Sequence, residues 1–67
     1  MMNLIINGEE LQVADVLSVS ELLEHLKLDG KRVAVEVNLE IVRREARSSF
    51  ALHENDKIEI VSFIGGG

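Results

Sequence analysis

A single segment of this chain carries a helical pattern, and it lies between segments with the pattern of β-strands. Ser18 and Glu21 have the spacing of a capping box, in which each side chain satisfies a backbone N–H at the start of a helix. Apolar residues recur at i, i+3, i+4 and i+7 along one helix face: Val19, Leu22, Leu23 and Leu26. We expect the helix to run to about Lys27 and Gly30 to end it in a left-handed conformation. Because an apolar face needs a surface to pack against, this helix must cover a sheet.

The segment before the helix has the signature of a β-hairpin. NLIIN and EELQVA, near residues 3–7 and 9–14, are separated by Asn7-Gly8. Both turn residues tolerate a positive φ, which a tight two-residue hairpin turn requires.

Strand patterns also follow the helix. KRVAVEVN, residues 31–38, alternates apolar and other side chains and predicts a half-buried strand. Ile41 and Val42 are consistent with a short strand, whereas residues 43–49 have no clear period and are expected to be irregular. The last run, KIEIVSF, places apolar groups on both faces, which is typical of a central strand buried on both sides.

This order of elements predicts an α+β fold, a mixed sheet of four to five strands with one main helix packed across it. The β-grasp arrangement fits the order and the length, with the last strand between the first strand and the strand at 31–38. At 67 residues the chain is long enough for one small domain. We assign residues 1–64 to that domain and residues 65–67 to a flexible glycine tail.

Composition excludes several classes of function. The chain has no cysteine, so disulfides, thiolate metal sites and cysteine nucleophiles are absent. A net charge of −5 disfavours nucleic acid as a partner. No apolar run approaches the ~20 residues of a membrane span, and the start lacks a signal-peptide pattern, so we expect a cytoplasmic protein without a membrane partner. His25 and His53 lack a third ligand, which argues against a metal site.

Nothing in the sequence indicates an enzyme. The carboxylates are not paired around a pocket, and no glycine-rich phosphate loop precedes a helix. We therefore expect no catalytic residues and no cofactor bound by this chain.

Three glycines, Gly65, Gly66 and Gly67, follow the last strand and reach roughly 10 Å at ~3.3–3.6 Å per residue. Without Cβ atoms such a segment can enter a narrow channel and present its terminal carboxylate to a reactive group. That carboxylate would need activation by a partner, most simply as an acyl-adenylate made from ATP. Frayed chain ends are also rich in glycine, so the three residues alone do not decide between these interpretations.

In combination, the residues resemble the ThiS family, the ubiquitin-like sulfur carriers of bacterial thiamine biosynthesis. The ending IEIVSFIGGG is similar to the family's IEIV-x-F-V-GGG, and SELLEHLKL, VAVEVN and EIVRRE fall where the family has its helix, its third strand and an EIVPRE-like stretch. Two positions depart from the family's pattern. Leu39 stands where glycine is common, and Arg43 stands where proline is common.

The resemblance implies a ubiquitin-like carrier cycle. A ThiF-like adenylyltransferase would use ATP to adenylate the carboxylate of Gly67, and a sulfur-donating enzyme such as a cysteine desulfurase would supply the sulfur. The resulting thiocarboxylate would pass to a ThiG-like thiazole synthase. Gly65 and Gly66 would enter the partner active sites. Phe63 and Ile64 stand next to this tail in the sequence, and we expect at least one of them to belong to an exposed apolar docking surface, the alternative being that both are core residues.

Other interpretations remain open at this point. The chain could be a related carrier, such as a small subunit of molybdopterin synthase, or a protein modifier that forms an isopeptide bond through Gly67. A third alternative is an interaction domain without a carrier role. The basic residues Arg43, Arg44 and Arg47 are expected to be a solvated face or to meet an acidic patch, and Phe50 is expected in the core.

Overall fold

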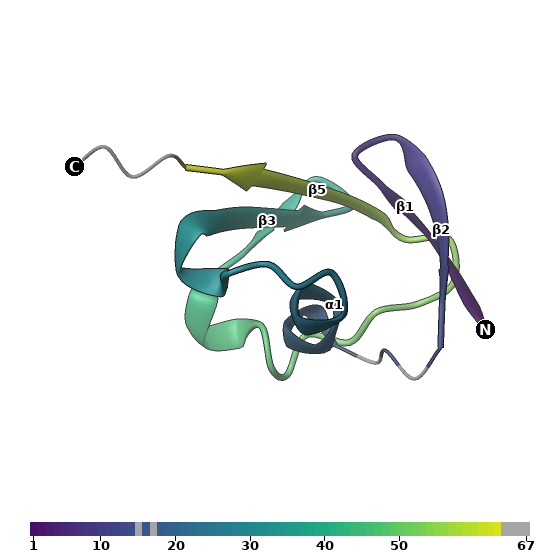
Figure 1. The fold of residues 1–67 in the computed structure, drawn as a ribbon, viewed down its shortest axis with the longest axis horizontal. Coiled ribbons are helices and arrows are strands. Elements are labelled where there is room, and N and C mark those ends of the chain that lie inside the picture. The colour runs from purple at the N-terminus through teal and green to yellow at the C-terminus, as the bar shows by residue number, and fades with distance from the viewer. Residues whose placement is uncertain (15, 17, 64–67) are drawn as a thin grey trace.

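The computed structural model describes residues 1–14, 16 and 18–63. It contains one five-stranded sheet of order β2-β1-β5-β3-β4, and α1 crosses one face of this sheet (Figure 1). The mixed sheet with one main helix is the architecture that the sequence predicts. The elements, including two short 3-10 turns, are β1 Met2–Ile6, β2 Glu9–Val13, α1 Val19–His25, η1 Gly30–Arg32, β3 Val33–Val37, β4 Glu40–Val42, η2 Arg44–Ala46 and β5 Lys57–Ser62.

β5, the last strand in the sequence, is the central strand of the sheet. It pairs parallel with β1 and antiparallel with β3, while β2 and β4 pair antiparallel with the outer sides of β1 and β3. The predicted position of the last strand, between the first strand and the strand at 31–38, is therefore confirmed. The predicted boundary between domain 1–64 and tail 65–67 lies outside the described residues.

The β1–β2 hairpin turns as the Asn-Gly pair predicts. Asn7 has φ 51° and Gly8 has φ 84°, the two positive values of a tight hairpin turn. The Asn7 side chain also joins this turn to β5. Its Nδ2 donates to the carbonyl of Ile60 (3.1 Å), and its Oδ1 accepts from the N–H of Ile60 (2.8 Å). A side-chain amide thus continues the β1–β5 pairing beyond the end of β1.

The helix begins as predicted but ends differently. Ser18 Oγ accepts from the N–H of Glu21, and Glu21 Oε1 accepts from the N–H of Ser18, so the capping box is present. The left-handed residue after the helix is Lys27 (φ 59°), and the N–H of Leu28 bonds to the carbonyl of Leu23, which closes a Schellman motif. The prediction that Gly30 stops the helix is wrong, because the chain has already turned and Gly30 begins η1.

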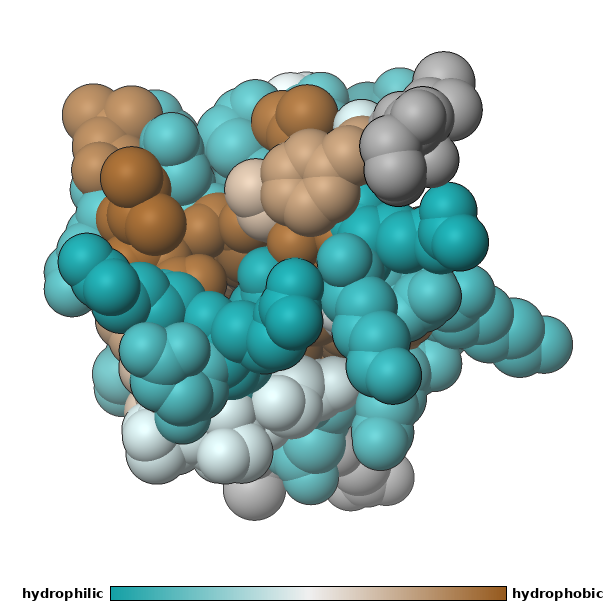
Figure 2. Space-filling model, turned by 90° about the vertical axis from the view of Figure 1, so that its left-hand side faces the viewer, coloured by the Kyte–Doolittle hydropathy of each residue, from teal (hydrophilic) through white to brown (hydrophobic). Residues whose placement is uncertain are grey.

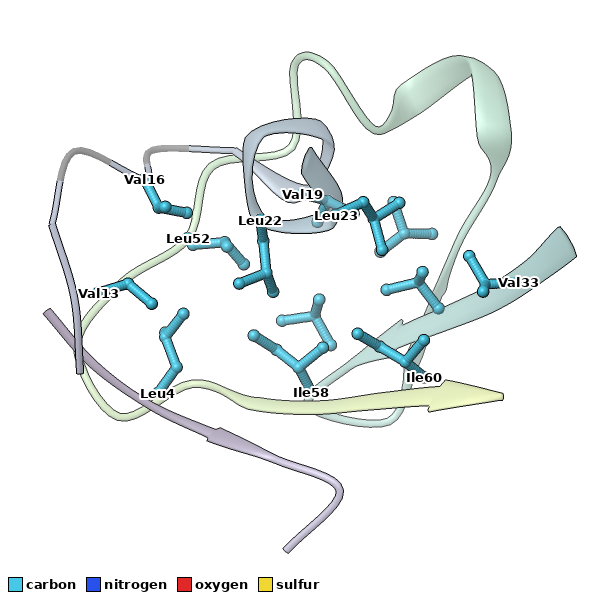
Figure 3. Close-up of a cluster of buried hydrophobic side chains, with 13 residues drawn as sticks. Leu4, Val13, Val16, Val19, Leu22, Leu23, Val33, Leu52, Ile58 and Ile60 are labelled. Carbon is cyan, nitrogen blue, oxygen red and sulfur yellow. The ribbon is translucent and has the colours of Figure 1, made fainter. Parts of the chain in front are cut away.

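The core lies between α1 and one face of the sheet (Figure 3). Leu22 from the helix meets Leu4 of β1 and Ile58 of β5, and all three are fully buried. The other members of the cluster come from the strands, the helix and the connecting segments: Val13, Val16, Val19, Leu23, Val33, Val35, Val37, Val42, Leu52 and Ile60. Phe50 is partly buried and packs against this cluster, as expected.

The opposite face of β5 is exposed. Ile58 and Ile60 point to the core, but Val61 is 60% exposed and Phe63, just after the strand, is 50% exposed. The prediction that the last strand is buried on both faces is therefore wrong, because α1 covers only one face of the sheet. We call the uncovered side the outer face.

Leu39 occupies a conformation that favours glycine. Asn38 (φ 51°) and Leu39 (φ 70°) form the two-residue turn between β3 and β4. The Leu39 side chain is 89% exposed, so it has little packing to offset the steric cost of a positive φ.

We predict that Leu39→Gly raises the free energy of unfolding by roughly 0.5–1 kcal/mol, because glycine adopts this φ without a Cβ clash. Urea denaturation followed by far-UV circular dichroism would measure the change. Leu39→Ala is the matched control, since it removes the same exposed side chain but keeps the Cβ. Equal stability of the glycine and alanine variants would contradict the strain argument.

Candidate functional site

The candidate site is the C-terminal end of β5, the strand Lys57–Ser62. The N–H of Phe63 donates to the carbonyl of Arg32 (2.8 Å), and Ser62 lies opposite Val33 in the register with β3. Phe63 is therefore held to the sheet just after the end of β5. Gly67 lies four positions after Phe63, a span of at most roughly 14 Å for an extended chain.

The remaining predicted site residues are Ile64, Gly65, Gly66 and Gly67, which lie outside the described residues. Their roles stay predictions. The structure does describe the end of β5 that precedes them in the sequence.

An apolar patch lies on the outer face beside this end of β5. Val61 stands opposite Ala34 of β3, Phe63 follows two residues after Val61, and Ile41 lies on the neighbouring strand β4. All four residues are exposed, Ile41 by 70%. Figure 2 shows hydrophobic side chains gathered at this end of the molecule. We call Ala34, Ile41, Val61 and Phe63 the outer apolar patch.

The structure places Phe63, a docking residue predicted from the sequence, on the outer apolar patch. The side chain is exposed on a patch of similar residues, and its role in docking stays a prediction. Ile41 and Val61 share the patch, although the sequence pattern had assigned them to strands without a role at the surface. These residues are exposed because α1 covers only one face of the sheet. The apolar pattern of a strand does not specify how many faces of its sheet are covered.

The basic residues after β4 do not form one surface cluster. Arg43 and Arg44 are exposed, but Arg47 is only 6% exposed. Its Nη1 donates to the carbonyl of Gly30 (2.6 Å) and its Nη2 donates to the carbonyl of Val33 (2.7 Å). The interpretation of a solvated or partner-facing cluster is therefore wrong for Arg47. A planar fork of donors suits two carbonyls at the junction of η1 and β3, which is why arginine is buried here.

The other polar candidates show no site either. His25 is exposed in the last turn of α1, and His53 Nδ1 lies 4.0 Å from Asp56 Oδ2. Within the described ranges, no three His, Cys, Asp or Glu side chains are grouped so that they could hold a metal ion. Among the helices that the structure describes, none is long and apolar enough to span a bilayer.

Comparisons with known sequences point to one family. A sequence model of the ThiS family matches residues 3–67. The sulfur carrier protein ThiS of Bacillus subtilis is 38% identical over 63 residues, which cover 92% of this chain and 96% of that protein. The thiazole synthase of Paramagnetospirillum magneticum is 48% identical over 66 residues. This chain spans only 20% of that synthase's length.

Solved structures agree with the fold. The crystal structure of the thiamine biosynthesis protein ThiS from Geobacter metallireducens matches with a TM-score of 0.84 at 39% identity, over 98% of this chain and all of that chain. A solution structure of a thiamine biosynthesis protein from the same organism matches with a TM-score of 0.81. The predicted ubiquitin-like β-grasp fold is confirmed by this likeness together with the five-stranded sheet and its one helix.

We predict that Arg47→Met lowers the free energy of unfolding by about 2–3 kcal/mol, because two carbonyls below the surface lose their hydrogen bonds to a charged group. Methionine keeps much of the apolar stem, so the loss reports mainly on the guanidinium. Arg44→Met is the matched control on an exposed side chain and should change stability by less than about 0.5 kcal/mol. Similar values for the two variants in thermal or urea unfolding would show that the buried hydrogen bonds are unimportant.

Proposed function

This chain belongs to the ThiS family, and from that premise we propose that it is a sulfur carrier for thiamine biosynthesis, with the carboxylate of Gly67 as its reactive group. The extent of the family match carries the proposal, because the match runs through residue 67 and includes the three glycines. The chain is then a co-substrate of partner enzymes, and catalysis belongs to those partners.

The chemistry follows from the poor reactivity of a carboxylate. At neutral pH it is anionic and has no good leaving group, so a nucleophile cannot displace its oxygen. A ThiF-like adenylyltransferase would let a Gly67 carboxylate oxygen attack the α-phosphorus of ATP and release pyrophosphate. The outer sulfur of a persulfide on a donor such as a cysteine desulfurase would then attack the carbonyl carbon and release AMP, and a thiol reductant would cleave the S–S bond of the resulting acyl disulfide. The product is a thiocarboxylate at Gly67, and the ATP is bound by the enzyme.

The described scaffold suits this role. β5 is hydrogen-bonded to a neighbouring strand on each side along its first half, and Phe63 is hydrogen-bonded to Arg32, so the last described residue before the tail is held in place. Gly65 and Gly66 lack Cβ atoms and would pass through a narrow entrance. Since Gly67 lies at most roughly 14 Å from Phe63, an enzyme acting on it must also approach the outer apolar patch. We therefore propose that Phe63, with Ile64, contacts the partner.

The proposed acceptor of the sulfur is a ThiG-like thiazole synthase. Thiazole synthases of Paramagnetospirillum magneticum and Magnetococcus marinus each contain a segment similar to this chain, at 48% and 38% identity. The presence of a segment similar to this chain within a thiazole synthase supports the proposal that the chain delivers sulfur to such a synthase. We place the exchange in the cytoplasm, which supplies the ATP.

The chemical step can be tested by intact-mass spectrometry after incubation with a ThiF-like enzyme, ATP and sulfide. We expect the mass change of one oxygen-to-sulfur exchange, localised to Gly67 by fragmentation. A variant lacking Gly66 and Gly67 should keep the circular dichroism spectrum and show no exchange. If several such enzymes convert a known carrier but leave this chain unchanged, the carrier proposal fails.

Docking through Phe63 gives a second prediction. Phe63→Ser should lower kcat/KM for adenylation by about tenfold or more, because aromatic side chains at the centre of an interface carry much of its binding energy. The unfolding midpoint should change little, since the ring is half exposed. Leu39→Ser is the matched control at an exposed apolar residue near the opposite end of β5. An equal effect of both variants would argue against a specific contact at Phe63.

A further inference from the structure

The C-terminal half of β5 has a neighbouring strand on one edge only. Toward β3, the N–H of Asn38 donates to the carbonyl of Lys57 (2.7 Å), and the N–H of Phe63 donates to the carbonyl of Arg32 (2.8 Å). Alternate residues face the partner in an antiparallel ladder. The backbone groups of the intervening residues, including Ile60 and Ser62, therefore point to the opposite edge.

The β1–β2 hairpin occupies that opposite edge only as far as Ile60. The N–H of Asn7 donates to the carbonyl of Ile58 (2.8 Å), and the Asn7 side chain bonds to both backbone groups of Ile60. β1 then ends and the chain reverses at Asn7-Gly8, so the bonds from the hairpin stop here within the described part of the chain. Figure 1 shows β5 continuing past the hairpin beside β3. The next N–H and C=O on this edge belong to Ser62.

We propose that this edge at Ser62 is a docking site for an extended segment of the enzyme that activates Gly67. The segment would add to β5 as a further strand, accepting a hydrogen bond from the Ser62 N–H and donating one to the Ser62 carbonyl. Unpaired groups along a strand edge are a template for such strand addition. Val61 and Phe63 flank Ser62 on the outer face and are 60% and 50% exposed. Side chains of the added strand can therefore cover them.

The choice of occupant rests on the proposed function. Ser62 lies five residues before Gly67, which corresponds to at most roughly 18 Å of extended chain. An enzyme that holds Gly67 in its active site therefore comes within that distance of this edge, which makes it the occupant that the proposed function favours. A second copy of the chain fits less well, because each copy carries a net charge of −5 and the two would repel each other.

The test uses the full chain made by chemical synthesis, with a methyl group on the backbone nitrogen of Ser62. This change removes the donor at the open edge and blocks approach of a strand, but leaves the nitrogens that face β3 intact. The matched control carries the same methyl group on Gln12, whose N–H points to the open edge of β2 by the same alternation. Adenylation by a ThiF-like enzyme and ATP would be measured for both and for the unmodified chain.

We expect N-methylation at Ser62 to lower kcat/KM by about tenfold with kcat little changed, because the lost bonds serve binding. N-methylation at Gln12 should leave both constants within twofold. If the Ser62 derivative also stays within twofold, the docking proposal is overturned while the carrier proposal stands. If the unmodified chain is not adenylated, both are overturned.

Hydrogen exchange of the unmodified chain identifies the occupant. The Ser62 amide should exchange rapidly in the free chain and slow down when the enzyme is added. If it slows instead as the concentration of the chain alone is raised, a second copy occupies the edge and the proposal is overturned.

Discussion

The structure depends on the central position of β5. Every pairing that joins the β1–β2 hairpin to the β3–β4 hairpin runs through this strand. A two-stranded hairpin on its own is marginally stable in water, so neither hairpin would persist without β5 between them. Asn7 strengthens the shorter of the two junctions by placing its side-chain amide against Ile60. The segment that makes the sheet continuous is also the segment that leads to Gly67, so the proposed reactive end starts from a well-fixed part of the fold.

The second constraint is that one short helix covers only one face of the sheet. A chain of 67 residues has too little material for a layer on each side, and its buried fraction is correspondingly small. Val61 and Phe63 are consequently exposed on the outer face, beside an edge of β5 that the hairpin does not reach. The apolar patch and the open edge therefore meet where the tail begins. A carrier protein must contact its partner enzymes, and the uncovered outer face provides a surface for the proposed contact.

Two residues depart from local rules, and each has a structural explanation. Leu39 has a positive φ because the β3–β4 connection is a two-residue turn. Asn38, the other residue of this turn, accepts a hydrogen bond at Oδ1 from the N–H of Lys57 at the start of β5 (3.0 Å). Arg47 is buried because its guanidinium donates to two carbonyls at the junction of η1 and β3. Three arginines within five residues suggest a surface cluster in the sequence. The carbonyls that accept hydrogen bonds from Arg47 lie 14 and 17 residues away in the sequence, so no local pattern predicts these bonds.

Features that depend on neighbours a few residues apart can be predicted from the sequence alone. Local hydrogen bonds and periodicity set the capping box at Ser18, the Asn7-Gly8 turn and the apolar face of α1. The glycine ending is recognised in the sequence because it resembles the ending of a known family. Only the folded chain shows that Lys27 rather than Gly30 ends the helix, that Arg47 is buried and that one face of β5 is uncovered. Each of these depends on which distant segment packs or pairs at that position. Long-range partners are chosen by the whole fold, because each backbone group and apolar surface is satisfied by whichever element lies closest in space.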